Sequence, residues 1–244
     1  MRDKDDCDTN EIREEVDVHY TTCIYLKDPM LLYRDMEILK HHFNSYGNTL
    51  DHICYRTFER LFQEIEAKGC PPLTILETGT AAWGTSSTYL FDAYVRKYGG
   101  KFWTVDINPA HSDAVKPHMS GNTTVVTADS VKFLSDWVKE HPGERADVVY
   151  LDSYDLDFDS PEPSGNHGLQ EFNAIIPALQ KDSLLLIDDT PILSDEFLEE
   201  EPRMYITMRR TYDRIGICPG KGMYVMNTIA APPLDHWYQV LYRF

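Results

Sequence analysis

The chain has 244 residues, 42% of them hydrophobic, and its 40 acidic against 23 basic side chains give a formal net charge of -17. Phosphate backbones repel so acidic a chain, so a nucleic-acid partner is not expected. No run reaches the roughly 18 apolar residues of a membrane helix. The N-terminus lacks the apolar core of a secretory signal. We therefore expect a cytoplasmic protein with no membrane partner.

The apolar pattern predicts a helix first, and then alternating strands and helices. Residues 49–68 carry an apolar stripe from Leu50 to Ile65 at helical spacing, and Gly69 ends that helix. Short apolar runs predict five strands, at 73–78, 101–107, 123–129, 146–152 and 183–189. Helices are expected between them, through Lys97 and over 111–118, 130–140 and 168–180. A final pair of strands, at 211–218 and 222–228, is joined by the turn-rich sequence CPGKG, which favours an antiparallel hairpin.

This alternation predicts an α/β fold. Right-handed crossovers make the sheet mostly parallel, with seven strands including the antiparallel C-terminal hairpin. We expect an acidic, flexible tail over 1–17, an N-terminal helical cap over 18–70 and one α/β domain over 71–244. In such folds, ligands bind beyond the carboxyl ends of the strands.

The negative charge is concentrated in two segments. Residues 1–17 carry a net charge of -5, which fits a solvated tail. Residues 146–201 hold fifteen acids and one base, a net charge of -14, although they include two of the predicted strands. Acids within a core-forming segment indicate a site. The five cysteines are scattered without a CxxC pair, so reduced thiols are expected rather than a zinc or redox site.

Polar and glycine residues follow the first three predicted strands. Gly79 begins a Gly/Thr/Ser turn into a helix, where backbone N–H groups can approach a ligand. Asp106 ends the second strand, 27 positions later, and its carboxylate suits the two hydroxyls of a ribose. Asp129 and Ser130 end the third strand and can border an adenine. The alternative is that these acids and serines only cap the helices that follow.

The segments ILETGTAAWGTSS, FWTVDIN and VVTADS, in this order, resemble the class I S-adenosylmethionine-dependent methyltransferases over about residues 73–228. The resemblance implies that the loop from Gly79 to Ser86 wraps the methionine part of the cofactor and that Asp106 holds its ribose. Gly79 and Gly84 are five positions apart, where the family usually has four, so the loop follows a different path. The cofactor-binding residues implied are Glu77, Gly79, Thr80, Gly84, Thr85, Ser86, Asp106, Ile107, Asp129, Ser130 and Asp152.

Three acids follow the fourth and fifth predicted strands: Asp152, Asp188 and Asp189. Neighbouring strand ends bring these carboxylates together, and they repel one another strongly unless a cation lies between them. Carboxylate oxygens favour Mg²⁺ or another hard divalent cation. The alternatives are a helix cap before Pro191, a pair of surface acids or a salt-bridged cluster.

The acid pattern looks like that of the divalent-metal-dependent O-methyltransferases of the catechol and the macrolide or antibiotic-sugar types. There the metal binds two neighbouring substrate oxygens, and a nearby base removes a proton. The resemblance implies Asp152 in the reacting centre and Asp155 as the first choice of base. His167, at the expected start of the next helix, is the second choice. No Lys or Arg occurs from Ala146 to Gln180, which argues against the lysine base of the catechol type.

The sequence favours a Mg²⁺-dependent methyltransferase that methylates a hydroxyl of a small molecule, such as a sugar or natural product. Two alternatives stay open: a metal-independent N- or O-methyltransferase of a cationic small molecule, and a catalytically inactive protein that binds the cofactor. A hydroxylase-like or other enzymatic activity on the same fold is a further alternative. A homo-oligomer is possible, since the aromatic C-terminus (Trp237 to Phe244) can line an interface or pack as a last strand.

Overall fold

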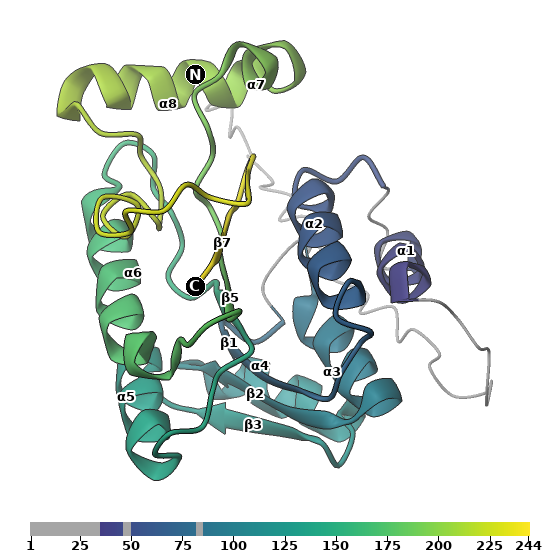
Figure 1. The fold of residues 1–244 in the computed structure, drawn as a ribbon. Coiled ribbons are helices and arrows are strands. Elements are labelled where there is room, and N and C mark those ends of the chain that lie inside the picture. Colours follow the sequence, from purple (N-terminus) through teal and green to yellow (C-terminus); the bar gives the residue numbers. More distant parts are fainter. Residues whose placement is uncertain (1–34, 46–49, 82–84) are drawn as a thin grey trace, which may run out of the picture. The chain divides into compact units, whose positions relative to one another are not determined.

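A seven-stranded sheet forms the centre of the computed structural model, which describes residues 35–45, 50–81 and 85–244 (Figure 1). The strand order is β3-β2-β1-β4-β5-β7-β6. The first five strands are parallel, and β7 pairs antiparallel with β5 and β6. The bounds are β1 Leu73–Thr78, β2 Gly100–Asp106, β3 Thr123–Thr127, β4 Val148–Leu151, β5 Leu184–Ile187, β6 Asp235–His236 and β7 Val240–Arg243.

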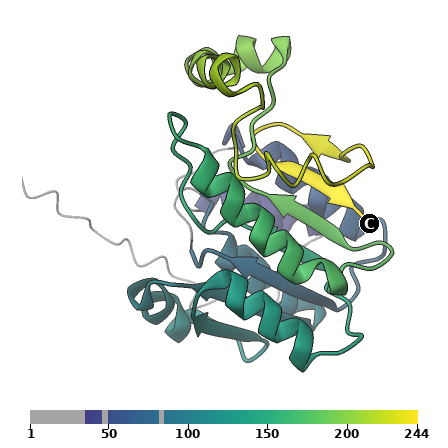
Figure 2. The same cartoon turned by 90° about the vertical axis from the view of Figure 1, so that its left-hand side faces the viewer.

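Helices cover both faces of the sheet (Figures 1 and 2). Helices α1 to α3 pack on one face, and α5 and α6 on the other, while α7 and α8 form a separate pair beyond β5. None of the helices in the described ranges is both long and apolar enough to cross a membrane. Their bounds are α1 Asp35–Ser45, α2 Tyr55–Glu66, α3 Ser87–Tyr98, α4 Pro109–Val115, α5 Ser130–Glu140, α6 Glu162–Ile175, α7 Asp195–Glu200 and α8 Pro202–Ile215, with 3-10 turns at Lys116–His118 and Ile176–Ala178.

Alternate residues of the central strands enter two different cores. In β1, Ile75 packs with α1 to α3, whereas Leu76 packs with α5 and α6. In β4, Tyr150 faces the first core and Val149 the second. Because both faces are covered, β4 and β5 are buried at every residue, which explains their continuous apolar sequence.

The structure confirms the α/β sheet and the five predicted parallel strands to within about two residues. Helix α2 is shorter than the predicted 49–68, because it begins at Tyr55. Its stripe from Phe58 to Ile65 is buried, but Leu50 is 42% exposed. Helices α1 and α2 share their core with the sheet. The predicted tail over 1–17 and the part of the cap up to residue 34 lie outside the described residues.

The predicted hairpin at 211–218 and 222–228 is wrong. Residues 211–215 belong to α8, and 221–228 form consecutive turns. The antiparallel strands are instead β6 and β7 near the C-terminus. Gly220 and Gly222 explain the difference, because they pack directly against Asp189 and Thr190, where a Cβ would lie 2.7–2.9 Å from the nearest atoms. The CPGKG segment therefore docks on the end of β5.

Helix α6 begins earlier than predicted, at Glu162 instead of residue 168. Pro163 suits its first turn, since the first N–H groups of a helix need no partner within it. His167 thus lies in the second turn of α6 and does not open the helix. The segment between β4 and α6 is correspondingly shorter than the predicted bounds of the strand and the helix imply.

Candidate active site

The carboxyl ends of β1 and β4 meet closely at Gly79. A Cβ at this position would lie 2.3 Å from the carbonyl oxygen of Asp152, and Gly79 has a positive φ of 88°. Its N–H donates to the carbonyl of Val105, 2.8 Å away, at the end of β2. Only glycine satisfies both requirements. The ends of three strands that carry predicted site residues therefore converge here.

Glu77 organises the start of the loop that follows β1. Its carboxylate accepts hydrogen bonds from the hydroxyls of Ser87 at 2.6 Å, Thr88 at 2.5 Å and Thr104 at 2.7 Å. The side chain is fully buried, and desolvation raises its pKa to about 7 although the three hydroxyls oppose the shift. Glu77 thus ties β1 to β2 and to the first turn of α3, beneath the loop that was predicted to hold the cofactor.

The predicted cofactor loop is described at both ends. The Thr80 N–H donates to Asp106 Oδ2 at 3.1 Å, and Ser86 stands at the N-terminus of α3 with a φ of 48°. Thr85 is only 3% exposed, and its Oγ1 has no hydrogen-bond partner among the described residues. Gly84 lies outside the described residues. A buried hydroxyl without a partner is costly, so Thr85 marks a place where a ligand can bond.

Asp106 lies at the carboxyl end of β2, as expected. Its Oδ1 accepts from the Asn108 N–H at 2.7 Å, and His111 Nδ1 lies 3.0 Å from Oδ2. Asn108, and not Asp106, caps α4, because its side chain accepts from the Ala110 N–H. The neighbouring Ile107 is 74% exposed, which leaves an apolar side chain beside the carboxylate.

Asp129 caps α5, the alternative that the sequence left open: its Oδ1 accepts from the Lys132 N–H at 2.8 Å. Ser130 is 6% exposed, and its Oγ lies 2.9 Å from His167 Nε2 and 3.3 Å from Ser153 Oγ. The ends of β3 and β4 are therefore joined through α6.

Asp152, Asp188 and Asp189 meet as the strand order predicted. Each offers one carboxylate oxygen, and these oxygens lie within 4.8 Å of one another. Asp152 and Asp188 are 8% exposed, and Asp189 is partly buried. Such a set of hard oxygen donors fits a divalent cation such as Mg²⁺.

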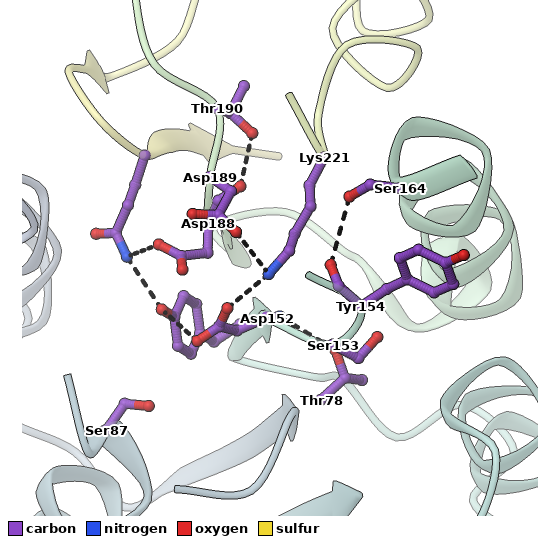
Figure 3. Close-up of polar contacts among 12 residues, drawn as sticks. Thr78, Ser87, Asp152, Ser153, Tyr154, Ser164, Asp188, Asp189, Thr190 and Lys221 are labelled. Atoms are coloured by element: carbon purple, nitrogen blue, oxygen red, sulfur yellow. Dashed lines mark hydrogen bonds and ion pairs between the residues drawn. The ribbon is translucent and has the colours of Figure 1, made fainter. Parts of the chain in front are cut away.

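The three acids are also hydrogen-bonded within the protein. Lys221 extends toward them from the 220–223 turn, with its Nζ 2.7 Å from Asp152 Oδ1 and 3.3 Å from Asp189 Oδ2 (Figure 3). Neutral donors complete the cluster. Tyr150 Oη donates to Asp152 Oδ2 at 3.1 Å, Gln239 Nε2 donates to Asp188 Oδ1 at 2.6 Å, and Tyr238 Oη donates to Asp189 Oδ1. The salt-bridged alternative is thus realised in the structure.

Burial and mutual repulsion shift the pKa values of this cluster. Desolvation, together with the charge of Asp152, raises the pKa of Asp188 to about 8. Desolvation also raises the pKa values of Asp152 and Asp189, although Lys221 opposes both shifts. Burial alone would lower the pKa of Lys221, but the three carboxylates raise it well above its usual range. Lys221 is therefore an ammonium ion at neutral pH.

The two predicted bases occupy different surroundings. Asp155 is exposed in the loop after β4 and is not one of the acids whose oxygens meet. His167 Nε2 lies 3.0 Å from Ser153 Oγ and 3.5 Å from Glu171 Oε1. The hydrogen bond with Glu171 raises the pKa of His167. His167 is thus connected, through Ser153, to the residue next to Asp152.

The sequence analysis missed Lys221 and its neutral companions. No lysine follows the fourth strand within residues 146–180, whereas Lys221 is 69 positions beyond Asp152. The available signal was the sequence Gly220-Lys221-Gly222, a charged residue between two glycines, which was interpreted as a hairpin turn. Tyr150 and Gln239 carried no signal, since they looked like ordinary strand residues.

A cavity of about 390 Å³ borders the segment that follows Asp189. It is lined by residues of this segment, of α8, of the turn that follows α8 and of β6, namely Ile192, Leu193, Arg209, Tyr212, Cys218 and His236. His236 Nε2 lies 2.8 Å from the carbonyl oxygen of Thr190. The volume is within the range of small-molecule sites.

Comparisons with known proteins agree with this architecture. Residues 76–190 match the family model described as a methyltransferase domain. Among solved structures, the MycE methyltransferase from the mycinamycin biosynthetic pathway, in complex with Mg, SAH and mycinamycin VI, is similar with a TM-score of 0.54 and 14% identity. The alignment covers 87% of this chain and 56% of MycE. A second MycE structure, with Mg and SAH, gives a TM-score of 0.53 at 14% identity and covers 86% of this chain and 55% of MycE.

The O-methyltransferase NovP is a further neighbour, with a TM-score of 0.47, 12% identity and coverage of 86% and 88% of the two chains. The comparison with curated proteins found no match. At 14% identity, the likeness to MycE establishes the shared fold, and this chain spans little more than half the length of MycE. Residues 76–190, a little under half of the chain, therefore match the methyltransferase domain model, and the chain shares the fold of MycE.

Proposed function

We propose that the protein transfers a methyl group from S-adenosylmethionine to a hydroxyl of a small molecule, such as a sugar or natural product, with Mg²⁺ bound at Asp152, Asp188 and Asp189. The observation that carries the proposal is the meeting of three carboxylate oxygens within 4.8 Å at the ends of β4 and β5. This acidic cluster lies beside the end of β1, since Gly79 is packed against the Asp152 backbone.

The residues around Gly79 suit S-adenosylmethionine. The buried Thr85 Oγ1, just before α3, supplies an unused hydrogen-bonding atom. Asp106 has two carboxylate oxygens for a ribose, with Ile107 exposed beside them for contact with an apolar ring face. In this proposal, Ser130 borders the adenine, and Asp129 acts by fixing the start of α5.

The acidic cluster suits Mg²⁺ by the chemistry of its donors: three carboxylates, all hard oxygen ligands. When bound, the metal supplies positive charge that lowers the pKa of a coordinated substrate hydroxyl. The protein itself orients the three carboxylates, through Tyr150 for Asp152, Tyr238 for Asp189 and Gln239 for Asp188. The MycE structures, which contain Mg and SAH on the same fold, support this assignment.

His167 is the better placed of the two predicted bases. It is held by Ser130, Ser153 and Glu171, and Ser153 directly follows Asp152. Asp155 is exposed, so a role as base needs the β4–α6 loop to move toward the acceptor. We therefore assign proton removal to His167, with Asp155 in contact with the acceptor. The acceptor itself extends from the cluster toward the cavity next to Thr190.

Calorimetry with S-adenosylhomocysteine, with and without Mg²⁺, tests the proposal together with methyl transfer from labelled S-adenosylmethionine to a panel of polyhydroxylated small molecules. We expect cofactor binding in the micromolar range and methyl transfer that EDTA abolishes. Asp188→Ala should abolish the response to Mg²⁺ while cofactor affinity changes less than about threefold. If the wild type does not bind the cofactor, the proposal is wrong. If Asp188→Ala stays fully active, Asp188 is not a metal ligand.

A metal-independent reaction is the second candidate, and Lys221 is the observation that favours it. Its ammonium already neutralises part of the charge of Asp152 and Asp189. In that case the acidic cluster would attract a cationic acceptor for N- or O-methylation. Methyl transfer that persists in EDTA, with a preference for amine-bearing over neutral acceptors, would select this candidate.

A further inference from the structure

Lys221 reaches the acidic cluster on a turn that is built to hold it there. Its backbone N–H donates to the carbonyl of Asp189 at 3.0 Å, and the Gly222 N–H donates to Thr190 Oγ1 at 2.9 Å. The flanking glycines allow this contact: a Cβ on Gly220 would lie 2.7 Å from Asp189 O, and one on Gly222 would lie 2.9 Å from the Thr190 side chain. The turn is therefore fixed to the end of β5.

Helix α6 closes the turn from the other side. A Cβ on Gly168 would lie 2.4 Å from the carbonyl oxygen of Lys221, so only glycine fits at this point of the helix. The backbone of Lys221 is thus held between β5 and α6, and only its side chain is free to change position. That side chain is 4% exposed and ends at Asp152 and Asp189.

The ammonium contacts two of the three acids that would hold a metal. It lies 2.7 Å from Asp152 Oδ1 and 3.3 Å from Asp189 Oδ2, whereas Mg²⁺ binds oxygen at roughly 2.0–2.1 Å and demands near-octahedral geometry. The other side-chain hydrogen-bond donors to these acids among the described residues, Tyr150, Tyr238, Gln239 and Cys54, are neutral. Two cations at the same oxygens repel each other strongly in a buried site.

We infer that Lys221 is an internal cation that competes with the divalent metal for Asp152 and Asp189, so that its side chain withdraws when the metal binds. The inference builds on the metal site of the proposed function. It gives Lys221 a positioning role: the ammonium keeps the acids together in the metal-free protein and sets how much free metal is needed to load the site.

Metal binding to a Lys221 variant tests the inference without any measurement of activity. We would titrate Mn²⁺ into the wild type, Lys221→Met and Lys181→Met, and follow free Mn²⁺ by electron paramagnetic resonance. Lys221→Met should bind Mn²⁺ at least tenfold more tightly than the wild type, because the competing charge is gone. Lys181 is exposed and lies in the acid-rich segment 146–201 that holds the three acids, so Lys181→Met should bind Mn²⁺ as the wild type does.

Lys221→Met also leaves three buried acids without a counterion and can fail to fold, so a second measurement uses the wild type. An amine-acetylating reagent, followed by peptide mass spectrometry, should label Lys221 at least fivefold faster with saturating Mg²⁺ than without it. Lys181 is the internal reference and should be labelled equally in both conditions.

Equal or weaker Mn²⁺ binding by folded Lys221→Met would overturn the inference, as would unchanged labelling of Lys221 in a wild type that binds Mg²⁺. Both results would leave the proposed metal-dependent function intact. Mn²⁺ binding by Lys221→Met but not by the wild type at millimolar concentrations would support the inference and contradict Mg²⁺ dependence. Folded proteins that all bind no metal would refute both.

Discussion

The buried carboxyl of Glu77 predicts a measurable dependence of stability on pH. Burial raises its pKa from 4.5 to about 7, so between these values the folded protein holds a proton that the unfolded chain has lost. The contribution of Glu77 to stability is therefore fully present below pH 4.5 and is lost as the pH rises through 7. At 1.36 kcal/mol per pKa unit, this shift changes the free energy of unfolding by about 3 kcal/mol in total. Most of that change, about 2 to 3 kcal/mol, falls between pH 5 and pH 8.

Glu77→Gln removes this titration while it keeps the shape of the side chain. The amide can still accept from Thr88 and Thr104, and the Ser87 hydroxyl can rotate to accept from it. We expect the free energy of unfolding of the wild type, relative to the variant, to fall by about 2 to 3 kcal/mol from pH 5 to pH 8.

Urea unfolding followed by circular dichroism at pH 5, 6, 7 and 8 measures that difference. The control is Glu66→Gln, which makes the same substitution at an exposed position of α2 and leaves the buried carboxyl of Glu77 in place. If the free energies of unfolding of the wild type and Glu77→Gln differ by a constant amount over this range, burial does not raise the pKa of Glu77. The same conclusion follows if the wild type becomes more stable than the variant toward pH 8.

Two further predictions concern the cofactor side of the site. Asp106→Asn removes one acceptor and the charge at the proposed ribose contact, so affinity for S-adenosylhomocysteine should fall about tenfold, or roughly 1.4 kcal/mol; unchanged affinity by calorimetry would contradict the assignment. Gly79→Ala places a Cβ 2.3 Å from the Asp152 carbonyl at a positive φ, so it should lower the free energy of unfolding by at least about 1–3 kcal/mol and reduce cofactor affinity. A stable Gly79→Ala protein with normal affinity would show that the strand ends are less closely packed.

The local sequence determined the parallel part of the fold. Strands β4 and β5 are buried on both faces, so each is a short continuous apolar run, and such runs are visible without a structure. The same logic placed Asp152 and Asp188 together, because parallel strands end at the same edge of a sheet. These features depend on short-range patterns and on a general rule of topology.

The predictions failed where the structure depends on contacts between distant segments. The segment predicted as a hairpin reads like two strands joined by a turn, yet Gly220 and Gly222 are required by a close approach to Asp189 and Thr190. The start of α6 was placed too late for a local reason: Pro163 is typical of a loop, but it is also acceptable in the first turn of a helix.

The sequence by itself determined that this protein is an α/β methyltransferase-like chain with three acids at two neighbouring strand ends. Only the tertiary structure decided what surrounds those acids. Lys221 is 69 residues from Asp152 along the chain, and Gln239 is 51 residues from Asp188. No local period or spacing encodes such pairs, because they are selected by packing and by the cost of burying charge without a partner. The acidic residues of the sequence therefore predicted a nearby cation. In the structure, the Lys221 ammonium, from a turn distant in sequence, lies against Asp152 and Asp189.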